Sequence, residues 1–170
     1  MRFALTAGFV GVIVAANAAT SALGLVTVAG VTVTAGTWLA GLAFVARDGL
    51  HGAGGSRWVL AAIVAGAAVS AALSPALALA SGVAFLLSEL ADWSVYAPLR
   101  RRGRTRAALA SNVVGSFVDT ATFLLIAGFP LALAPAQVAI KITVSAAAVL
   151  GVRLAVLRQP VLTSGGGRHA

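Results

Sequence analysis

Residues 107–128 read AALASNVVGSFVDTATFLLIAG, an apolar stretch with one carboxylate, Asp119, near its middle. A helix needs about 20 such residues to cross roughly 30 Å of hydrocarbon. A charged group at that depth is costly, so it usually faces the interior of a helix bundle and marks a site or a pathway. At three- and four-residue spacings, one face of this helix carries Asn112, Ser116, Asp119 and Phe123. The stretch therefore predicts a membrane helix with a polar inner face.

The composition of the whole chain agrees with this interpretation. Of 170 residues, 60% are hydrophobic and 9% are charged, whereas roughly a quarter are charged in a soluble domain. Apolar segments near span length lie at 3–20, 28–46, 58–73, 76–97, 107–128 and 136–157. We therefore predict an all-α, polytopic integral membrane protein with six transmembrane helices. They form a single domain at residues 1–160, followed by a flexible cytoplasmic tail at 161–170.

The distribution of arginine predicts the orientation. A net charge of +8 would suggest nucleic acid in a soluble protein, but here the arginines flank apolar segments and act as topology signals beside anionic lipid. On one side of the six-span arrangement lie Arg2, Arg47, Arg57, Arg100, Arg101, Arg102, Arg104, Arg106, Arg153, Arg158 and Arg168. The positive-inside rule then puts both termini in the cytoplasm. One alternative stays open: Ala16-Asn17-Ala18 resembles a signal-peptide cleavage site, and cleavage would leave five spans.

Further polar residues extend the inner face across the membrane. Glu89 and Asp92 share one face of the fourth helix, and Lys141, the single lysine, lies about 8 Å from the outer end of the sixth. Asp119 lies about 18 Å from the cytoplasmic end of its helix. A purely structural Asp119–Lys141 pair is an open alternative, as is an Asp92 side chain that reaches toward water.

Carboxylates beside amides and aromatic rings suit a planar solute with hydrogen-bond donors and acceptors. A guanine-like edge has adjacent N–H groups that one carboxylate accepts together, and a carbonyl that Lys or Asn can reach. Four aromatic side chains are candidates for a stacking face: Trp38, Phe85, Phe117 and Phe123. The sequence permits such a ligand without requiring it.

These residues resemble the queuosine precursor transporters, also called the putative vitamin uptake (VUT) family, over most of the chain. The segments that carry the resemblance are Asn17, Ala35-Gly36-Thr37, Ala46-Arg47-Asp48, Ala80-Ser81, Ser88-Glu89-Leu90-Ala91-Asp92, Tyr96, Ala110-Ser111-Asn112, Gly115-Ser116-Phe117-Val118-Asp119-Thr120, Phe123 and Ile140-Lys141. Their order and spacing around the basic loop at 100–106 are more specific than any single segment. The chain departs from the family pattern in its short termini and outer loops and in a glycine-rich second loop.

The resemblance implies a multi-pass protein of the bacterial inner membrane that imports 7-deazaguanines such as preQ0 or preQ1 by secondary or facilitated transport. The substrate-binding positions that it implies are Asn17, Glu89, Asn112, Ser116, Asp119 and Lys141. Asp119 and Glu89 would accept hydrogen bonds from the base. Lys141 and Asn17 would donate to it or would act as the charge partner of Asp119. Asp48 and Asp92 are implied as gating or coupling residues. No cofactor and no metal are expected.

Other functions make different demands on the sequence. A substrate-binding membrane subunit of a vitamin-type ABC importer is the main alternative, and it would need an energising partner. An intramembrane enzyme is disfavoured because the sequence has no GxSxG or HExxH motif and no cysteine, although an aspartyl mechanism with Asp119 and Asp92 in contact stays open. The partners we expect are therefore a purine-like small molecule, the lipid bilayer and a second copy in a homodimer, and not nucleic acid.

Overall fold

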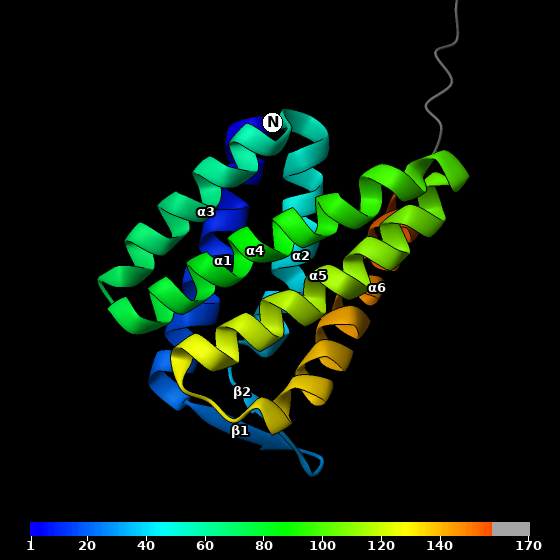
Figure 1. The fold of residues 1–170 in the computed structure, drawn as a ribbon. Coiled ribbons are helices and arrows are strands. Elements are labelled where there is room, and N and C mark those ends of the chain that lie inside the picture. The colour runs from blue at the N-terminus through cyan, green and yellow to red at the C-terminus, as the bar shows by residue number, and fades with distance from the viewer. Residues whose placement is uncertain (158–170) are drawn as a thin grey trace, which may run out of the picture.

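The computed structural model describes the backbone of residues 1–157, and their side chains except at positions 100, 104–105, 108–109, 152–153 and 155–157. The described chain is mostly helical, with one small hairpin (Figure 1). Its elements are α1 (Arg2–Leu23), β1 (Leu25–Val28), β2 (Val31–Thr34), α2 (Thr37–Gly54), α3 (Ser56–Ala71), α4 (Pro75–Leu99), η1 (Arg100–Arg102), α5 (Arg104–Ala127), η2 (Leu131–Leu133) and α6 (Ala134–Leu157). The predicted tail at 161–170 lies outside the described residues.

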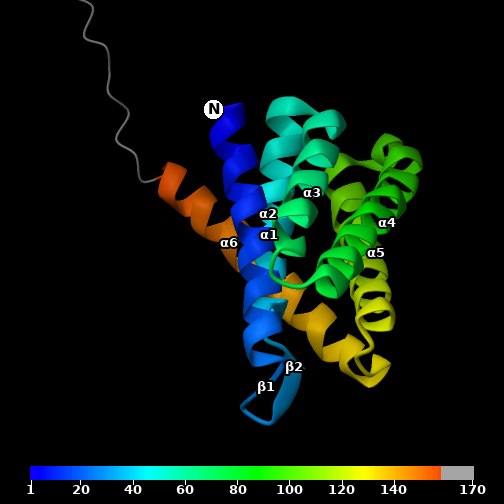
Figure 2. The same ribbon diagram turned by 90° about the vertical axis from the view of Figure 1, so that its left-hand side faces the viewer.

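The six helices pack as a closed ring. In order around it, α1 packs against α2, α2 against α6, α6 against α5, α5 against α4, α4 against α3, and α3 against α1. The hairpin lies at one end of the ring, and the N-terminus and the α2–α3 turn lie at the other (Figures 1 and 2). We call these the hairpin end and the arginine end, because Arg2, Arg57 and the basic segment at 100–106 belong to the second.

The lengths of the helices bear on how many cross a membrane. Among the described residues, four stretches are long and apolar enough: Arg2–Leu23, Pro75–Leu99, Ala110–Ala127 and Leu131–Gly151. The apolar helix α3 has 16 residues, or about 24 Å, and α2 carries a buried arginine. The structure therefore supports a multi-pass membrane protein. Six complete spans and two cytoplasmic termini stay predictions.

The distribution of side chains is the reverse of that in a soluble domain. Arg47, Asp119 and Lys141 are buried inside the ring, whereas Leu79 and Leu125 on its outer surface are more than half exposed. Ionisable groups inside and large apolar groups outside are typical of a bundle that faces hydrocarbon. Burial of Asp119 and Lys141 agrees with the predicted polar inner face of α5 and α6, whereas burial of Arg47 on α2 was not predicted.

The prediction of a helix at 28–46 is wrong for its first nine residues. β1 and β2 pair as an antiparallel hairpin, joined by the two-residue turn Ala29-Gly30 with φ of 50° and 80°. Two positive φ values are the geometry of the tight turns that fit the twist of a hairpin. The strands alternate β-branched Val and Thr, which favour extended backbone. An uncharged run of these residues has the hydropathy of a span, which explains the error.

The segment 47–57, which the predicted spans 28–46 and 58–73 leave as a loop, is also helical for most of its length. Helix α2 continues to Gly54, and α3 begins at Ser56. Gly55, with φ of 77°, makes the turn between them, a conformation that glycine adopts without steric cost. Arg47 is consequently a buried helical residue rather than a loop charge at a membrane surface.

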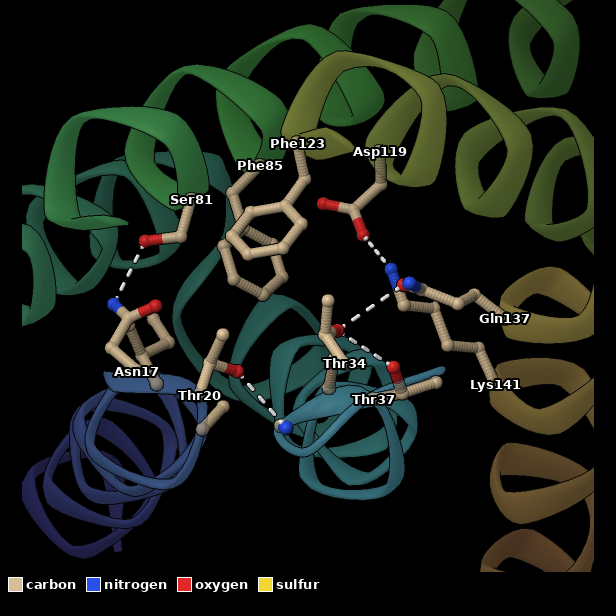
Figure 3. Close-up of a pocket in the computed structure, with 14 residues that line it drawn as sticks. Asn17, Thr20, Thr34, Thr37, Ser81, Phe85, Asp119, Phe123, Gln137 and Lys141 are labelled. Carbon is tan, nitrogen blue, oxygen red and sulfur yellow. Dashed lines mark hydrogen bonds and ion pairs between the residues drawn. The ribbon is translucent and has the colours of Figure 1, made fainter. Parts of the chain in front are cut away.

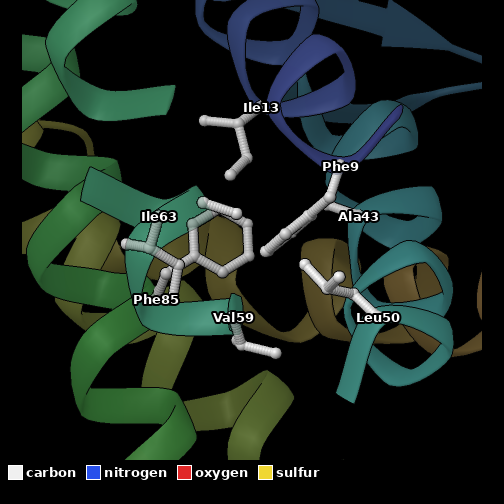
Figure 4. Close-up of a cluster of buried hydrophobic side chains, with 8 residues drawn as sticks. Phe9, Ile13, Ala43, Leu50, Val59, Ile63 and Phe85 are labelled. Atoms are coloured by element: carbon white, nitrogen blue, oxygen red, sulfur yellow. The ribbon is translucent and has the colours of Figure 1, made fainter. Parts of the chain in front are cut away.

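An apolar core fills the space between the first four helices (Figure 4). It consists of Phe9, Ile13, Ala43, Leu50, Val59, Ala62, Ile63 and Phe85. The rings of Phe9 and Phe85 meet edge to face, with centroids 5.9 Å apart. This packing fixes the Phe85 ring, which also forms a wall of the polar pocket described next.

Candidate functional site

A polar pocket lies near the hairpin end, inside the ring (Figure 3). Every α-helix except α3 contributes to its walls, and β2 does so as well. The lining residues are Ile13, Ala16, Asn17, Thr20, Thr34, Gly36, Thr37, Ala40, Ser81, Phe85, Asp119, Phe123, Gln137 and Lys141. The cavity has a volume of about 40 Å³, which is room for a few water molecules. We call it the hairpin-end pocket.

The strongest interaction in this pocket is an ion pair between α5 and α6. The Nζ atom of Lys141 donates to Asp119 Oδ2 at 2.6 Å and to Thr120 Oγ1 at 2.9 Å. Both side chains are almost completely buried. Asp119 Oδ1 accepts no hydrogen bond from the described residues, and Figure 3 shows it turned away from the ammonium, toward the side where Phe123 lies. One carboxylate oxygen is therefore available to a ligand.

An amide from α1 and two aromatic rings, from α4 and α5, complete the walls. Asn17 Nδ2 donates to Ser81 Oγ at 2.8 Å, which ties α1 to α4. Of the four aromatic candidates, Phe85 and Phe123 line the cavity. The other two, Trp38 and Phe117, are 40% and 58% exposed and line neither pocket described here.

The sequence analysis missed the hydroxyl groups and the second amide of this pocket. Thr20 Oγ1 accepts from the backbone N–H of Gly36 at 3.0 Å. Thr34 Oγ1 lies 2.9 Å from Thr37 Oγ1 and donates to Gln137 Oε1 at 3.4 Å. Uncharged polar residues are common as hydrogen-bonding groups between membrane helices, so they did not stand out. The available signal was spacing, because Gln137 precedes Lys141 by one turn on the same face of α6.

Two glycines, one at the N-cap of α2 and one within that helix, bring the pocket walls together. A Cβ atom at Gly36 would lie 2.3 Å from the carbonyl oxygen of Ala16 on α1, and one at Gly41 would lie 2.8 Å from Cβ of Val144 on α6. Small residues allow membrane helices to approach closely. These contacts hold α2 between α1 and α6, where the pocket lies.

A second pocket, which we call the arginine-end pocket, lies near the other end of the ring. Its lining residues are Asp48, His51, Gly52, Glu89, Asp92, Trp93, Tyr96, Ala97, Ser111 and Asn112. The cavity volume is about 360 Å³, far larger than that of the hairpin-end pocket. It is lined by three carboxylates.

Buried Arg47 is the partner that these carboxylates share. Its Nη2 lies 2.8 Å from Asp48 Oδ1 and 3.9 Å from Asp92 Oδ1, and its Nη1 lies 3.4 Å from Glu89 Oε2. His51 Nδ1 is 3.4 Å from the other Glu89 oxygen. The sequence analysis treated Arg47 as a topology signal, because it placed the residue in a loop.

The two pockets divide the predicted site residues. The hairpin-end pocket contains Asn17, Asp119 and Lys141, and the arginine-end pocket contains Asp48, Glu89, Asp92 and Asn112. Ser116 is buried but lines neither. The structure therefore does not place Glu89 and Asn112 beside Asp119, and it puts Asp92 and Asp119 in different pockets.

Aromatic side chains connect the two pockets. The Phe44 ring lies 6.2 Å from that of Phe85, measured between centroids, and the Arg47 guanidinium carbon lies 5.1 Å from the centroid of Phe44. Phe85 lines the hairpin-end pocket, and Arg47 binds the carboxylates of the arginine-end pocket. A solute moving from one pocket to the other along this line of contacts would have to displace these groups.

Comparison with known proteins gives one informative result. Residues 12–163 match the family model described as "Putative vitamin uptake transporter". The match extends over α1 to α6 and includes every residue of both pockets. The comparisons with curated proteins and with solved structures found no significant match.

Proposed function

The chain belongs to the putative vitamin uptake transporter family, and on this premise we propose that it imports 7-deazaguanine precursors of queuosine, such as preQ0 and preQ1, across the bacterial cytoplasmic membrane. The hairpin-end pocket is the proposed substrate site. The observation that carries the proposal is the buried Asp119 carboxylate, which keeps one oxygen available in a pocket with two phenylalanine rings.

The hydrogen-bonding groups of the pocket complement the edge of such a base. A 7-deazaguanine presents two adjacent N–H donors beside a carbonyl acceptor. A carboxylate oxygen accepts more than one hydrogen bond, so Asp119 can accept from the base while Lys141 stays paired to Oδ2. Lys141 has three N–H donors and uses two of them. The third is available to the carbonyl.

The charge of the pocket favours an uncharged solute. Asp119 and Lys141 carry one charge of each sign, and both are buried. A charged ligand would enter without a counter-charge, and an unpaired charge in a low-dielectric interior is strongly unfavourable. A neutral planar base needs only hydrogen bonds and the faces of Phe85 and Phe123.

The small volume of the pocket has a mechanistic consequence. About 40 Å³ is far below the roughly 300–1,000 Å³ of a typical ligand site. The walls must therefore separate before a base can bind. This requirement fits a transporter that exposes a central site alternately to the two sides of the membrane by moving one group of helices against another.

We assign Asp48 and Asp92 to gating or coupling at the arginine-end pocket. With Glu89 they supply three carboxylates around the single Arg47. Arg47 lies on α2 and Glu89 and Asp92 on α4, so these ion pairs link two helices of the ring. The surplus of negative charge suits a proton or a cationic partner, whereas the hairpin-end pocket suits a neutral one.

Uptake in cells tests the proposal. The chain is expressed in bacteria that can neither synthesise nor import the precursor, preQ0 is supplied at nanomolar concentration, and queuosine is measured in tRNA. We expect queuosine with the wild-type chain and none with Asp119→Asn at equal membrane abundance. Thr143→Ala, an exposed change on α6, serves as the control and should transport normally. Absence of rescue by well-expressed wild-type protein would contradict the proposal, and rescue only with added partner proteins would favour the ABC-importer alternative.

A further inference from the structure

Gln137 has a feature that helix packing does not explain. Its side chain on α6 is completely buried and lines the hairpin-end pocket. The amide nitrogen Nε2 has no hydrogen-bond partner among the described residues. Buried polar groups are nearly always paired, and an unpaired one is destabilising. An apolar side chain of the same length would avoid this cost, so the position invites a functional explanation.

A chain of hydroxyl groups holds the amide in one orientation. Thr34 donates to Gln137 Oε1, which leaves Thr34 Oγ1 to accept from the Thr37 hydroxyl. Both threonines are buried, so neither depends on water. With its oxygen engaged by β2, the amide presents its two N–H donors on its other side.

The unpaired N–H donors of Gln137 belong to the same pocket as the proposed binding groups Asp119 and Lys141. Gln137 and Lys141 are four residues apart on α6 and share a face. Lys141 in turn contacts Asp119 at 2.6 Å. Gln137, Lys141 and Asp119 line the same cavity, and in Figure 3 a dashed line joins the Gln137 amide to Thr34. A ligand that meets the free oxygen of Asp119 would lie within the same small cavity as the amide.

We propose that Gln137 is a specificity-determining residue that donates to a carbonyl of the ligand and selects a 6-oxo base over a 6-amino base. This inference rests on the proposed function of the hairpin-end pocket. It also gives the unexpected hairpin a role, because β2 supplies the hydroxyl that orients the amide. A site built to hydrogen-bond its ligand rejects analogues that leave its polar groups unpaired.

Binding to the purified full-length chain in lipid nanodiscs tests the proposal. The probes are 7-deazaguanine and 2,6-diamino-7-deazapurine, which share the ring and the 2-amino group. They differ at the 6-position and at N1, which carries a hydrogen only in the 6-oxo base, so the part of the preference that depends on Gln137 is read from the change in Gln137→Met. We expect the wild-type chain to prefer the 6-oxo base. Gln137→Met, which has a similar shape and no donor, should reduce that preference on the order of tenfold or more. Its melting temperature should be equal to or above that of the wild type, because an unpaired buried donor has been removed.

A second variant tests the orienting hydroxyl. Thr34→Val removes the hydroxyl that positions the amide and should reduce the same preference less than Gln137→Met does. Thr32→Val is the matched control on the same strand, since its hydroxyl pairs with Thr27 instead, and it should bind as the wild type does.

The outcomes separate this inference from the proposed function. If the wild-type chain binds neither base, the proposed substrate class is wrong. Tight binding of 7-deazaguanine with unchanged discrimination in Gln137→Met would overturn the role of Gln137 alone. A melting temperature lowered by several degrees, with discrimination retained, would mean that the side chain is structural. A wild-type preference for the 6-amino base would mean that the amide presents its oxygen, which also contradicts the proposal.

Discussion

The two polar pockets of this transporter differ in how their charges are balanced. At the hairpin end one carboxylate meets one ammonium at 2.6 Å, both buried, in a cavity of about 40 Å³. At the arginine end three carboxylates surround one guanidinium at 2.8–3.9 Å, in a cavity of about 360 Å³. The first arrangement suits recognition of a neutral solute. The second leaves negative charge unbalanced and suits a switchable contact between helices.

Exposure sharpens the difference between these pockets. Asp119 and Lys141 are 5% and 3% exposed, whereas Asp48 and Asp92 are 49% and 20% exposed. Water can therefore solvate Asp48 when Arg47 is lost, although Glu89 is only 12% exposed, whereas it cannot solvate Asp119 when Lys141 is lost. Removal of the cation should consequently destabilise the protein more at the hairpin end than at the arginine end.

The largest effect is expected for Lys141→Ala. It leaves a buried carboxylate without its cation, which costs about 3–5 kcal/mol of folding free energy, and it should abolish uptake. The double variant Lys141→Ala with Asp119→Asn removes both charges and should recover most of the stability without recovering uptake. Thermal unfolding in detergent and uptake in vesicles measure the two effects. Full uptake by the double variant would reduce the ion pair to a structural role.

A smaller loss of stability is expected for Arg47→Met. The exposure of Asp48 limits the cost to about 1–3 kcal/mol, but the ion pairs from α2 to α4 are lost. Preloaded vesicles should then release substrate faster than wild-type vesicles do. Arg57→Met, an exposed change at the same end of the ring, is the control. If Arg47→Met vesicles release substrate at the wild-type rate, the assignment of the arginine-end pocket to gating is wrong.

Gly36→Ala tests how the hairpin-end pocket is held together. The added Cβ would lie 2.3 Å from the carbonyl oxygen of Ala16, so α1 and α2 must separate, at a cost of about 1–3 kcal/mol. Substrate affinity should fall with stability. Gly11→Ala on α1, where nothing lies within 4 Å of the added atom, should change neither. Normal affinity in Gly36→Ala would show that the site tolerates this displacement.

The smallest effects should come from Asp92→Asn and from the charge of the ligand. Asp92 is the most distant of the three acids from Arg47, at 3.9 Å, so its neutralisation should change uptake only a fewfold, whereas Lys141→Ala should abolish it.

The cationic aminomethyl group of preQ1 should make preQ1 a weaker competitor than the neutral preQ0, because the hairpin-end pocket is already charge-balanced. Uptake assays measure the effect of Asp92→Asn, and competition in the same assays measures inhibition by preQ1 and by preQ0. Stronger inhibition by preQ1 would argue against a neutral pocket.

The difference between the two pockets also explains which of their residues could be recognised from the sequence. Asp119 and Lys141 were identifiable because charges inside apolar runs carry a large energetic penalty. Arg47 was missed because a glycine-rich segment suggested a loop, although a single glycine, Gly55, makes the turn. The hairpin at 25–34 was missed because hydropathy does not separate a β-branched strand from a membrane helix. Thr34 and Gln137 lie far apart in the sequence, and only the fold brings their side chains into contact.

The most direct test of the central claim is uptake of radiolabelled preQ0 into proteoliposomes that contain only this chain. We predict accumulation by the wild-type protein that unlabelled 7-deazaguanine suppresses, and no accumulation by the stable double variant Lys141→Ala with Asp119→Asn. Equal accumulation by both proteins would contradict the assignment of the hairpin-end pocket as the substrate site.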